Sequence, residues 1–522
     1  MKAETARRVV LIGLDGADFE KVSAWRPRLP FLDELISRGG VGPLASTLPP
    51  FTLTAWSTAM SGMNPGRTGV NCFPGRDFAR EPIEVDSGSV AVPRIWDVAG
   101  AAGRKSIVLN VPLTYPPPRV DGCLVSGFMT PSGAETFTWP DALRGELPKN
   151  YRTSLGFAQH RSEPDYFLRH LYDLTDTQFE AADALLAGRP WDVFVFVVSG
   201  TDWVQHYFCR GPGEPGSAQG EERILEYYRH VDEKLARLSR KFEDADILII
   251  SDHGFGKIPS RAAAVNAWLA REGFLTPRGG GTHRLLAASR LRKLPLAGLA
   301  RRVLPVRVRE KVARAGRPTR NAFDWEATRA HFALFMNHTG YIRIDRGERE
   351  ATKRLLEEKL GEFNRTAPGG PVFARVVARE DEFAGPFRDA FPDIFLEFAP
   401  EWIGTENPSG RIFSEIPPGG RAAATHRSRG ILIAAGPSIR RDWRTRSSLE
   451  DVAPTVYHLL GLELPEATDG RVLEEIFRPE ADAARRSPRR RAYEYTPART
   501  GTYSPEDRED LQKRLAALGY LD

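Results

Sequence analysis

Cysteine is scarce in this chain: among 522 residues only Cys72, Cys123 and Cys209 occur. Three cysteines cannot all pair with one another, and their spacing fits neither a zinc knuckle nor a disulfide framework. These features argue against the class of small, disulfide-rich secreted domains. We therefore expect reduced thiols and a cytoplasmic location.

Long apolar runs are absent as well. No stretch approaches the roughly 18 uninterrupted apolar residues that a membrane-spanning helix needs. Residues 1–8, ahead of the first expected strand, contain no apolar core of the kind found in a signal peptide. We accordingly expect neither secretion nor a membrane-spanning segment.

A strong excess of one charge is the third missing feature. The 73 basic and 68 acidic side chains leave a formal net charge of +5, which is small for this length and predicts no specific nucleic-acid binding. With 41% hydrophobic and 27% charged residues, the composition is that of a globular protein. The length suits one large α/β domain with insertions, or two to three ordinary domains.

The chain does contain short apolar segments that are followed by polar residues with metal-ligand chemistry. Segments 9–14, 191–199 and 247–250 are rich in β-branched or aromatic residues, which is typical of strands buried on both faces. In an open α/β sheet, ligands bind outside the carboxyl ends of the strands. Taken singly, each polar residue could instead cap a helix or fill a turn. Carboxylates and imidazoles, the donors that zinc and similar ions accept, follow all three segments: Asp15, Asp202, His206, Asp252 and His253.

A stretch rich in hydroxyl groups, residues 49–58, includes Thr52 and leads into an expected helix with prolines before it and glycines after it. A hydroxyl at a helix N-terminus gains from the helix dipole, and so does a bound anion. A lone threonine in such a place is most often only a helix cap. Beside a two-metal site it becomes a candidate nucleophile, because a metal lowers the pKa of a bound hydroxyl.

In this order the strand-end residues, together with Thr52 and a later His426, resemble the alkaline phosphatase superfamily, most closely its type I phosphodiesterase/nucleotide pyrophosphatase branch. The resemblance implies an α/β fold: a doubly wound, mostly parallel sheet with helices on both faces. The likeness covers three stretches, about residues 8–130, 190–256 and 421–475. Within the last stretch, Leu449–Gly461 and Asp469-Gly470 are similar to the superfamily's closing helix and turn.

The resemblance also implies two divalent metal ions. Mixed Asp/His ligands suit zinc, and ligand type leaves manganese open. One ion would be held by Asp202, His206 and His426, and the other by Asp15, Asp252, His253 and the Thr52 hydroxyl.

Thr52 would then be the catalytic nucleophile. It precedes Gly62 of a Ser-Gly pair by the ten residues usual in the family, whereas Thr54 does not. The family also has an asparagine downstream that holds a phosphoryl oxygen. Its position would fall near Phe73, and Asn71 is the nearest asparagine, so we assign substrate binding to Asn71.

The implied activity is hydrolysis of phosphodiester or nucleotide pyrophosphate bonds through a phosphothreonine intermediate. The substrate would be a small phosphate ester such as a nucleotide or nucleotide sugar. A phosphomonoesterase or phosphonate hydrolase on the same site is the alternative, in which Arg67 or Arg76 could reach the phosphate. Sulfatases share the fold and use a Cys-x-Pro-x-Arg signature. The string Cys72–Arg76 matches it, but too far beyond the nucleophile position, and we interpret the match as chance.

A different class of function remains open at this point. Residues 278–320 are rich in arginine, and the arginines and lysines of 284–314 could bind an anionic surface, with the metal site serving structure only. A solvated face of an inserted segment is the simpler interpretation.

The pattern divides the chain into four parts. The first part includes an expected helical cap over the strand ends at about residues 135–190. Strands at 341–344 and 392–398 and a helix at 348–360 predict a small α+β insertion. The four parts are a catalytic core over 1–256, a basic helical segment with the insertion over 257–420, the end of the core over 421–475, and an Arg-rich linker with a C-terminal helix over 476–522.

Overall fold

The computed structural model describes most of the chain. Asn71, Cys72, Arg76 and the basic segment 284–314, for which the sequence makes predictions, lie outside the described residues. The described residues are 7–70, 85–155, 163–209, 216–278, 323–336, 338–345, 347–408, 410–416, 424–497 and 503–518.

A nine-stranded sheet forms the centre of the main domain, with the order β18-β2-β17-β7-β1-β6-β3-β4-β5. The neighbours β7, β1, β6, β3 and β4 run parallel, whereas β17 runs antiparallel to both β7 and β2. This is the doubly wound α/β fold that the sequence predicts. The strands are β1 (Arg8–Leu14), β2 (Gly40–Ala45), β3 (Ser106–Leu109), β4 (Gly122–Val125), β5 (Thr138–Trp139), β6 (Val193–Val198), β7 (Ala245–Ile250), β17 (Arg429–Ala435) and β18 (Ser447–Ser448).

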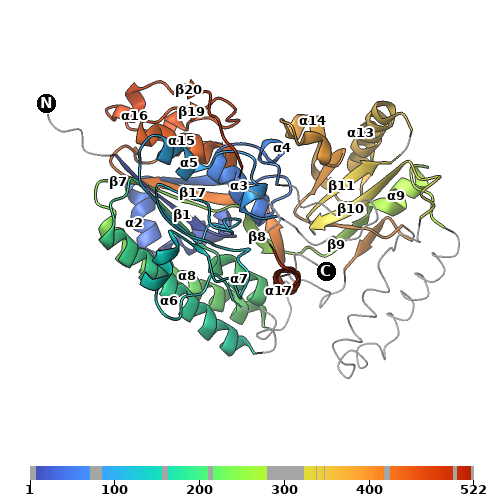
Figure 1. Cartoon of the computed structure of the whole chain (residues 1–522). Helices are drawn as coiled ribbons and strands as arrows, with labels where there is room; N and C mark the ends of the chain where they lie inside the picture. Colours follow the sequence, from blue (N-terminus) through green and yellow to red (C-terminus); the bar gives the residue numbers. More distant parts are fainter. Residues whose placement is uncertain are drawn as a thin grey trace.

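Helices cover both faces of this sheet (Figure 1). Alternate residues of β1 point to opposite faces, so that Val10 and Ile12 enter one core and Val9 and Leu11 enter the other. Burial on both faces explains the continuous apolar runs of the central strands. The first core is shared with α1 (Phe19–Trp25), α2 (Pro30–Arg38), α6 (Pro164–Gly188), α7 (Gly200–Phe208) and α8 (Ser217–Leu238), and the second with α3 (Thr52–Ser61), α5 (Ile95–Ala101) and α15 (Val452–Leu460).

The expectation of a helical cap over the strand ends at residues 135–190 is wrong for α6. The apolar side of this helix, including Phe167, Leu171 and Phe179, is buried in the same core as Phe194 and Phe196 of β6. An amphipathic pattern shows that a helix buries one side, but it does not tell which surface that side covers. In α6 the surface is a face of the main sheet.

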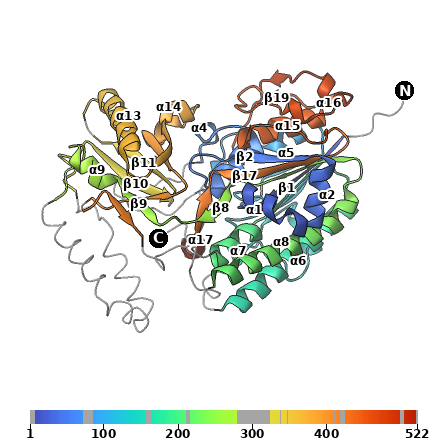
Figure 2. The ribbon, with the colours of Figure 1, turned by 180° about the vertical axis from the view of Figure 1, so that it is seen from behind.

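A second, smaller body stands beside the main sheet (Figure 2). Its four-stranded antiparallel sheet has the order β10-β11-β13-β12, and the predicted segments 341–344, 348–360 and 392–398 fall in a strand, a helix and a strand as expected. A short three-stranded sheet, β14-β9-β15, adjoins it. The elements are β9 (Arg261–Ala264), α9 (Val265–Arg271), β10 (Ala330–Met336), β11 (Thr339–Ile344), α13 (Arg349–Thr366), β12 (Phe373–Ala378), β13 (Ile394–Phe398), β14 (Trp402–Thr405) and β15 (Phe413–Glu415).

The C-terminal helix α17 (Pro505–Leu518) docks on the main domain, with Leu511 and Leu515 buried in its core. The buried guanidinium of Arg514 anchors it to the main domain: Nη2 donates to the Thr130 carbonyl at 2.6 Å, and Nη1 donates to the Ser154 hydroxyl. Within the described part of the chain, every helix is too short or too polar to cross a membrane.

We predict that Arg514→Met destabilises the protein, because Thr130 and Ser154 lose a charged donor within a mostly buried contact. Loss of a hydrogen bond to a charged group costs about 2 kcal/mol. Denaturant unfolding of the full chain measures the change. Lys513→Met is the matched control, since the Lys513 side chain is 62% exposed and its replacement should leave stability nearly unchanged. Equal stability of the two variants would contradict the anchoring role of Arg514.

Candidate metal centre

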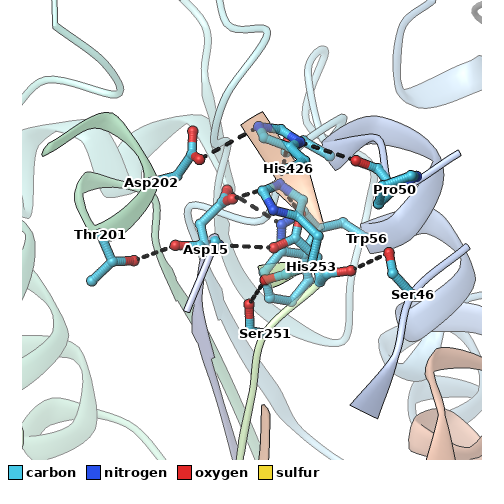
Figure 3. A network of polar contacts seen from close by, with 12 residues as sticks. Asp15, Ser46, Pro50, Trp56, Thr201, Asp202, Ser251, His253 and His426 are labelled. Atoms are coloured by element: carbon cyan, nitrogen blue, oxygen red, sulfur yellow. Dashed lines mark hydrogen bonds and ion pairs between the residues drawn. The ribbon is translucent and has the colours of Figure 1, made fainter. Parts of the chain in front are cut away.

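Neighbouring strand ends bring the predicted ligands together at one edge of the main sheet (Figure 3). Asp15 follows β1, Asp252 and His253 follow β7, and Asp202 and His206 lie on α7, directly after β6. His426 comes from β16 (Ala424–Arg427), which pairs with β8 (Gly254–Lys257), the strand that follows His253. The antiparallel pair β8–β16 thus delivers a ligand from much later in the sequence.

The first cluster consists of Asp202, His206 and His426, whose donor atoms all lie within 4.8 Å of one another. The Nε2 atoms of the two histidines are 3.0 Å apart, and the Asp202 oxygens lie 3.3 Å from His206 Nε2 and 3.6 Å from His426 Nε2. His426 Nδ1 lies 3.0 Å from the Pro50 carbonyl, which can only accept a hydrogen bond, so Nδ1 carries the proton. In the neutral ring, Nε2 then holds the lone pair. A backbone carbonyl is a common outer partner of a metal-bound histidine.

The second cluster consists of Asp15, Asp252 and His253. His253 Nδ1 donates to the Gly254 carbonyl at 3.0 Å, so its Nε2 faces the carboxylates with a lone pair. That atom lies 3.3 Å from Asp252 Oδ2 and 3.6 Å from Asp15 Oδ1. Both of these oxygens are buried and accept no hydrogen bond from any described residue.

The other carboxylate oxygens of this cluster are held by the protein. The Gly16 N–H donates to Asp252 Oδ1 at 3.2 Å, and the Trp56 indole donates to Asp15 Oδ2 at 3.4 Å. Gly13 permits this approach, since a Cβ there would lie only 2.3 Å from the Trp56 ring. The His253 and His426 rings stack with centroids 3.6 Å apart, which places the two clusters side by side.

Burial is the largest single influence on the pKa of each of the three carboxyl groups, Asp15, Asp252 and Asp202. It raises the pKa of Asp15 well above the ordinary value, and the charges of Asp252 and Asp202 raise that pKa further. Burial likewise raises the pKa of Asp252 to about 6, against the opposing effect of His253. Burial would also raise the pKa of Asp202, but its three histidine neighbours outweigh it and hold that pKa below the usual range. A site with several buried carboxylates therefore favours bound cations.

Thr52 lies beside the second cluster as the first residue of α3, and it is 2% exposed. Its Oγ1 is 3.3 Å from His253 Nε2, and the hydroxyl is the donor because Nε2 holds the lone pair. The preceding residue, Phe51, gives the helix no side-chain cap. Arg67, considered for phosphate binding in the monoesterase alternative, is instead engaged by Asp469, with Nε 2.9 Å from the carboxylate.

The donor set fits divalent metal ions. Each cluster offers carboxylate oxygen and imidazole nitrogen, the chemistry that zinc and manganese both accept. Sequence reasoning missed the groups that orient these donors. They are the carbonyls of Pro50 and Gly254, the Trp56 indole, and the Ser46 hydroxyl, which donates to the Asp252 carbonyl at 2.5 Å. Backbone carbonyls occur at every position, so no residue pattern could have identified these two.

Comparison with known proteins agrees with this arrangement. A family model described as type I phosphodiesterase/nucleotide pyrophosphatase matches residues 9–430. No curated protein matches the chain.

Among solved structures, phosphonoacetate hydrolase from Sinorhizobium meliloti 1021, in complex with phosphonoformate, is similar with a TM-score of 0.52 and 15% identity, covering 87% of this chain and 95% of that one. Murine ectonucleotide pyrophosphatase/phosphodiesterase 5 has a TM-score of 0.46 and 14% identity, covering 88% and 96%. At such identities the first of these likenesses supports the fold alone.

We predict that Zn2+ or Mn2+ raises the thermal midpoint of protein first treated with a chelator. An ion present at 100 times its Kd stabilises the native state by about 2.7 kcal/mol. A carboxyl group whose pKa is higher in the folded than in the unfolded protein stabilises the fold at pH values below its unfolded-state pKa. This stabilisation is lost as pH rises through the folded-state pKa, about 6 for Asp252. Binding must displace those protons, so the shift measured by scanning fluorimetry should be larger at pH 8 than at pH 5.

Asp252→Asn and Asp202→Asn should each reduce this shift and lower the bound metal measured by elemental analysis. Asp176→Asn, a half-exposed carboxylate on α6 that pairs with His230, is the control and should keep both. A midpoint that does not respond to either metal would contradict the assignment of a metal centre.

Proposed function

The chain belongs to the type I phosphodiesterase/nucleotide pyrophosphatase family of the alkaline phosphatase superfamily, and on this basis we propose that it cleaves phosphodiester or nucleotide pyrophosphate bonds through a phosphothreonine intermediate at Thr52. The chain is thereby a hydrolase. The single observation that supports the proposal best is the position of the Thr52 hydroxyl, 3.3 Å from His253 Nε2 and at the start of a helix.

We assign one metal ion to Asp202, His206 and His426, and the other to Asp15, Asp252 and His253, with zinc as the preferred ion and manganese as the alternative. When bound, the two ions would neutralise phosphoryl oxygens and lower the pKa of the Thr52 hydroxyl. The cytoplasmic location remains a proposal from the cysteine content.

Backbone N–H groups at the start of α3 would bind the phosphoryl group. The Ala55 N–H is the first in this helix to find an intrahelical acceptor, the Phe51 carbonyl at 2.8 Å. The N–H groups of Leu53 and Thr54 precede it in the first turn of the helix, where the dipole also favours an anion. Thr52 Oγ1 would attack phosphorus, the ester oxygen would leave, and water would later cleave the phosphothreonine to return the free hydroxyl.

A small phosphate ester such as a nucleotide or nucleotide sugar is the substrate class we propose. The printed names of the two similar structures mention nucleotide pyrophosphatase activity and a phosphonate ligand, and both are consistent with a phosphorus ester or acid as substrate. A phosphonate hydrolase or phosphomonoesterase on the same residues is the second candidate. Arg67, the arginine considered for phosphate binding in a monoesterase, instead donates to Asp469, so the diesterase is favoured.

We predict that metal-loaded wild-type protein hydrolyses bis-p-nitrophenyl phosphate faster than p-nitrophenyl phosphate. Thr52→Ala should lower kcat at least about a thousand-fold, because it removes the nucleophile. Thr54→Ala, a buried threonine on the same helix, is the matched control and should retain most of the activity.

Full activity in Thr52→Ala would exclude the nucleophile assignment. Faster turnover of the monoester would transfer the function to the second candidate. Absence of turnover of both compounds by protein with measured bound metal would contradict the proposed function and favour a specialised substrate or a binding role.

A further inference from the structure

The insertion has two apolar faces, and only one of them serves its own core. Phe332, Ile342 and Leu396 point toward α13 and α9, where they form a closed cluster. The neighbouring residues of the same strands point the opposite way. Ala333, Tyr341 and Phe395 form a second cluster there with Phe383, Phe391 and Leu48, a residue of the main domain. The second face is therefore packed against the segment that leads into α3.

Phe335, near the end of β10, contacts the residue that directly precedes Thr52. Its ring lies edge-on to the Phe51 ring, with centroids 5.3 Å apart and an interplanar angle of 87°. Such an arrangement contributes about 1 kcal/mol beyond the area it buries. Phe51 immediately precedes Thr52, and its carbonyl accepts the first intrahelical hydrogen bond of α3, from the Ala55 N–H.

The opposite end of α3 is held by the insertion too. α4 (Pro65–Thr68) follows α3 after a short turn, and the loop before η7 (Arg388–Ala390) docks on it. The Ala384 N–H donates to Asn64 Oδ1 at 3.2 Å, and the Phe387 N–H donates to the Gly66 carbonyl at 2.9 Å. The approach is close, since a Cβ on Gly66 would lie 2.5 Å from the Ala384 carbonyl oxygen.

α3 lacks the local device that usually fixes a helix start. Ser, Thr, Asp or Asn at the N-cap position normally accepts a backbone N–H, but Phe51 occupies that position and cannot. On one side the position is set by Pro50, whose carbonyl accepts from His426. On the other side it is set by the ring of Phe335. No insertion residue that the structure describes belongs to either metal cluster.

We propose that the insertion acts as a positioning unit for the nucleophile, and that Phe335 is its key positioning residue. By packing on Phe51 it fixes the first turn of α3, and with it the Thr52 hydroxyl and the backbone N–H groups at the helix start. The inference rests on the proposed function, because it assigns Phe335 to the reaction at Thr52. A displacement of about 1 Å at a reacting group can lower a rate about a hundred-fold.

The test compares Phe335→Leu with Phe332→Leu in metal-loaded full-length protein. Both variants remove a ring from the same strand, but Phe332 is buried on the insertion's own core. We expect Phe335→Leu to lower kcat for bis-p-nitrophenyl phosphate roughly 10- to 100-fold while KM and bound metal stay unchanged. Phe335→Tyr should restore kcat, and Phe332→Leu should lower the thermal midpoint without changing kcat below it.

Hydrogen exchange provides a readout that needs no substrate. The amides of residues 55–58 should exchange faster in Phe335→Leu than in wild type, and at the wild-type rate in Phe332→Leu. Wild-type kcat and wild-type exchange in Phe335→Leu would overturn the inference, as would an equal loss of kcat in both variants. If the wild type turns over no phosphoester, the proposed function fails, and the exchange comparison still decides whether Phe335 fixes the start of α3.

Discussion

Three carboxyl groups buried within one small volume are the constraint on which the rest of the site depends. Asp15, Asp202 and Asp252 are each at most 2% exposed. Removing one such charge from water costs several kcal/mol, and mutual repulsion adds to this cost. The protein offsets part of it with the Gly16 N–H and the Trp56 indole, but these reach only one oxygen of Asp252 and one of Asp15. The oxygens that remain lie beside imidazole lone pairs, an arrangement that divalent cations complete.

The parallel sheet makes this concentration of charge possible. β7, β1 and β6 are adjacent and parallel, so their carboxyl ends meet at one edge, and residues directly after them converge without any long loop. The imidazoles need a further level of support, because a neutral ring binds metal only through the nitrogen that holds no proton. The Pro50 and Gly254 carbonyls select that nitrogen on His426 and His253.

Sequence reasoning could reach the residues of the two clusters but not their surroundings. Asp15 and Asp252 directly follow apolar runs, so both the strand and its carboxyl end can be recognised locally. His426 has no such local signal and was assigned from the family resemblance. The packing of α6 on a sheet face and the contact of Phe335 with Phe51 depend on tertiary structure, and neither periodicity nor spacing contains that information.

The point at which the insertion enters the main domain explains why it stands so close to Thr52. The chain leaves the core through β8, directly after His253, and returns through β16, which contains His426. These two strands pair, with His426 opposite Phe255, so both connections start within a few residues of a ligand. A body tethered on these two strands is held next to the strand ends, where it can pack on Leu48 and Phe51. The return strand is also held to the insertion directly, because Ser428, two residues after His426, donates its hydroxyl to Glu397.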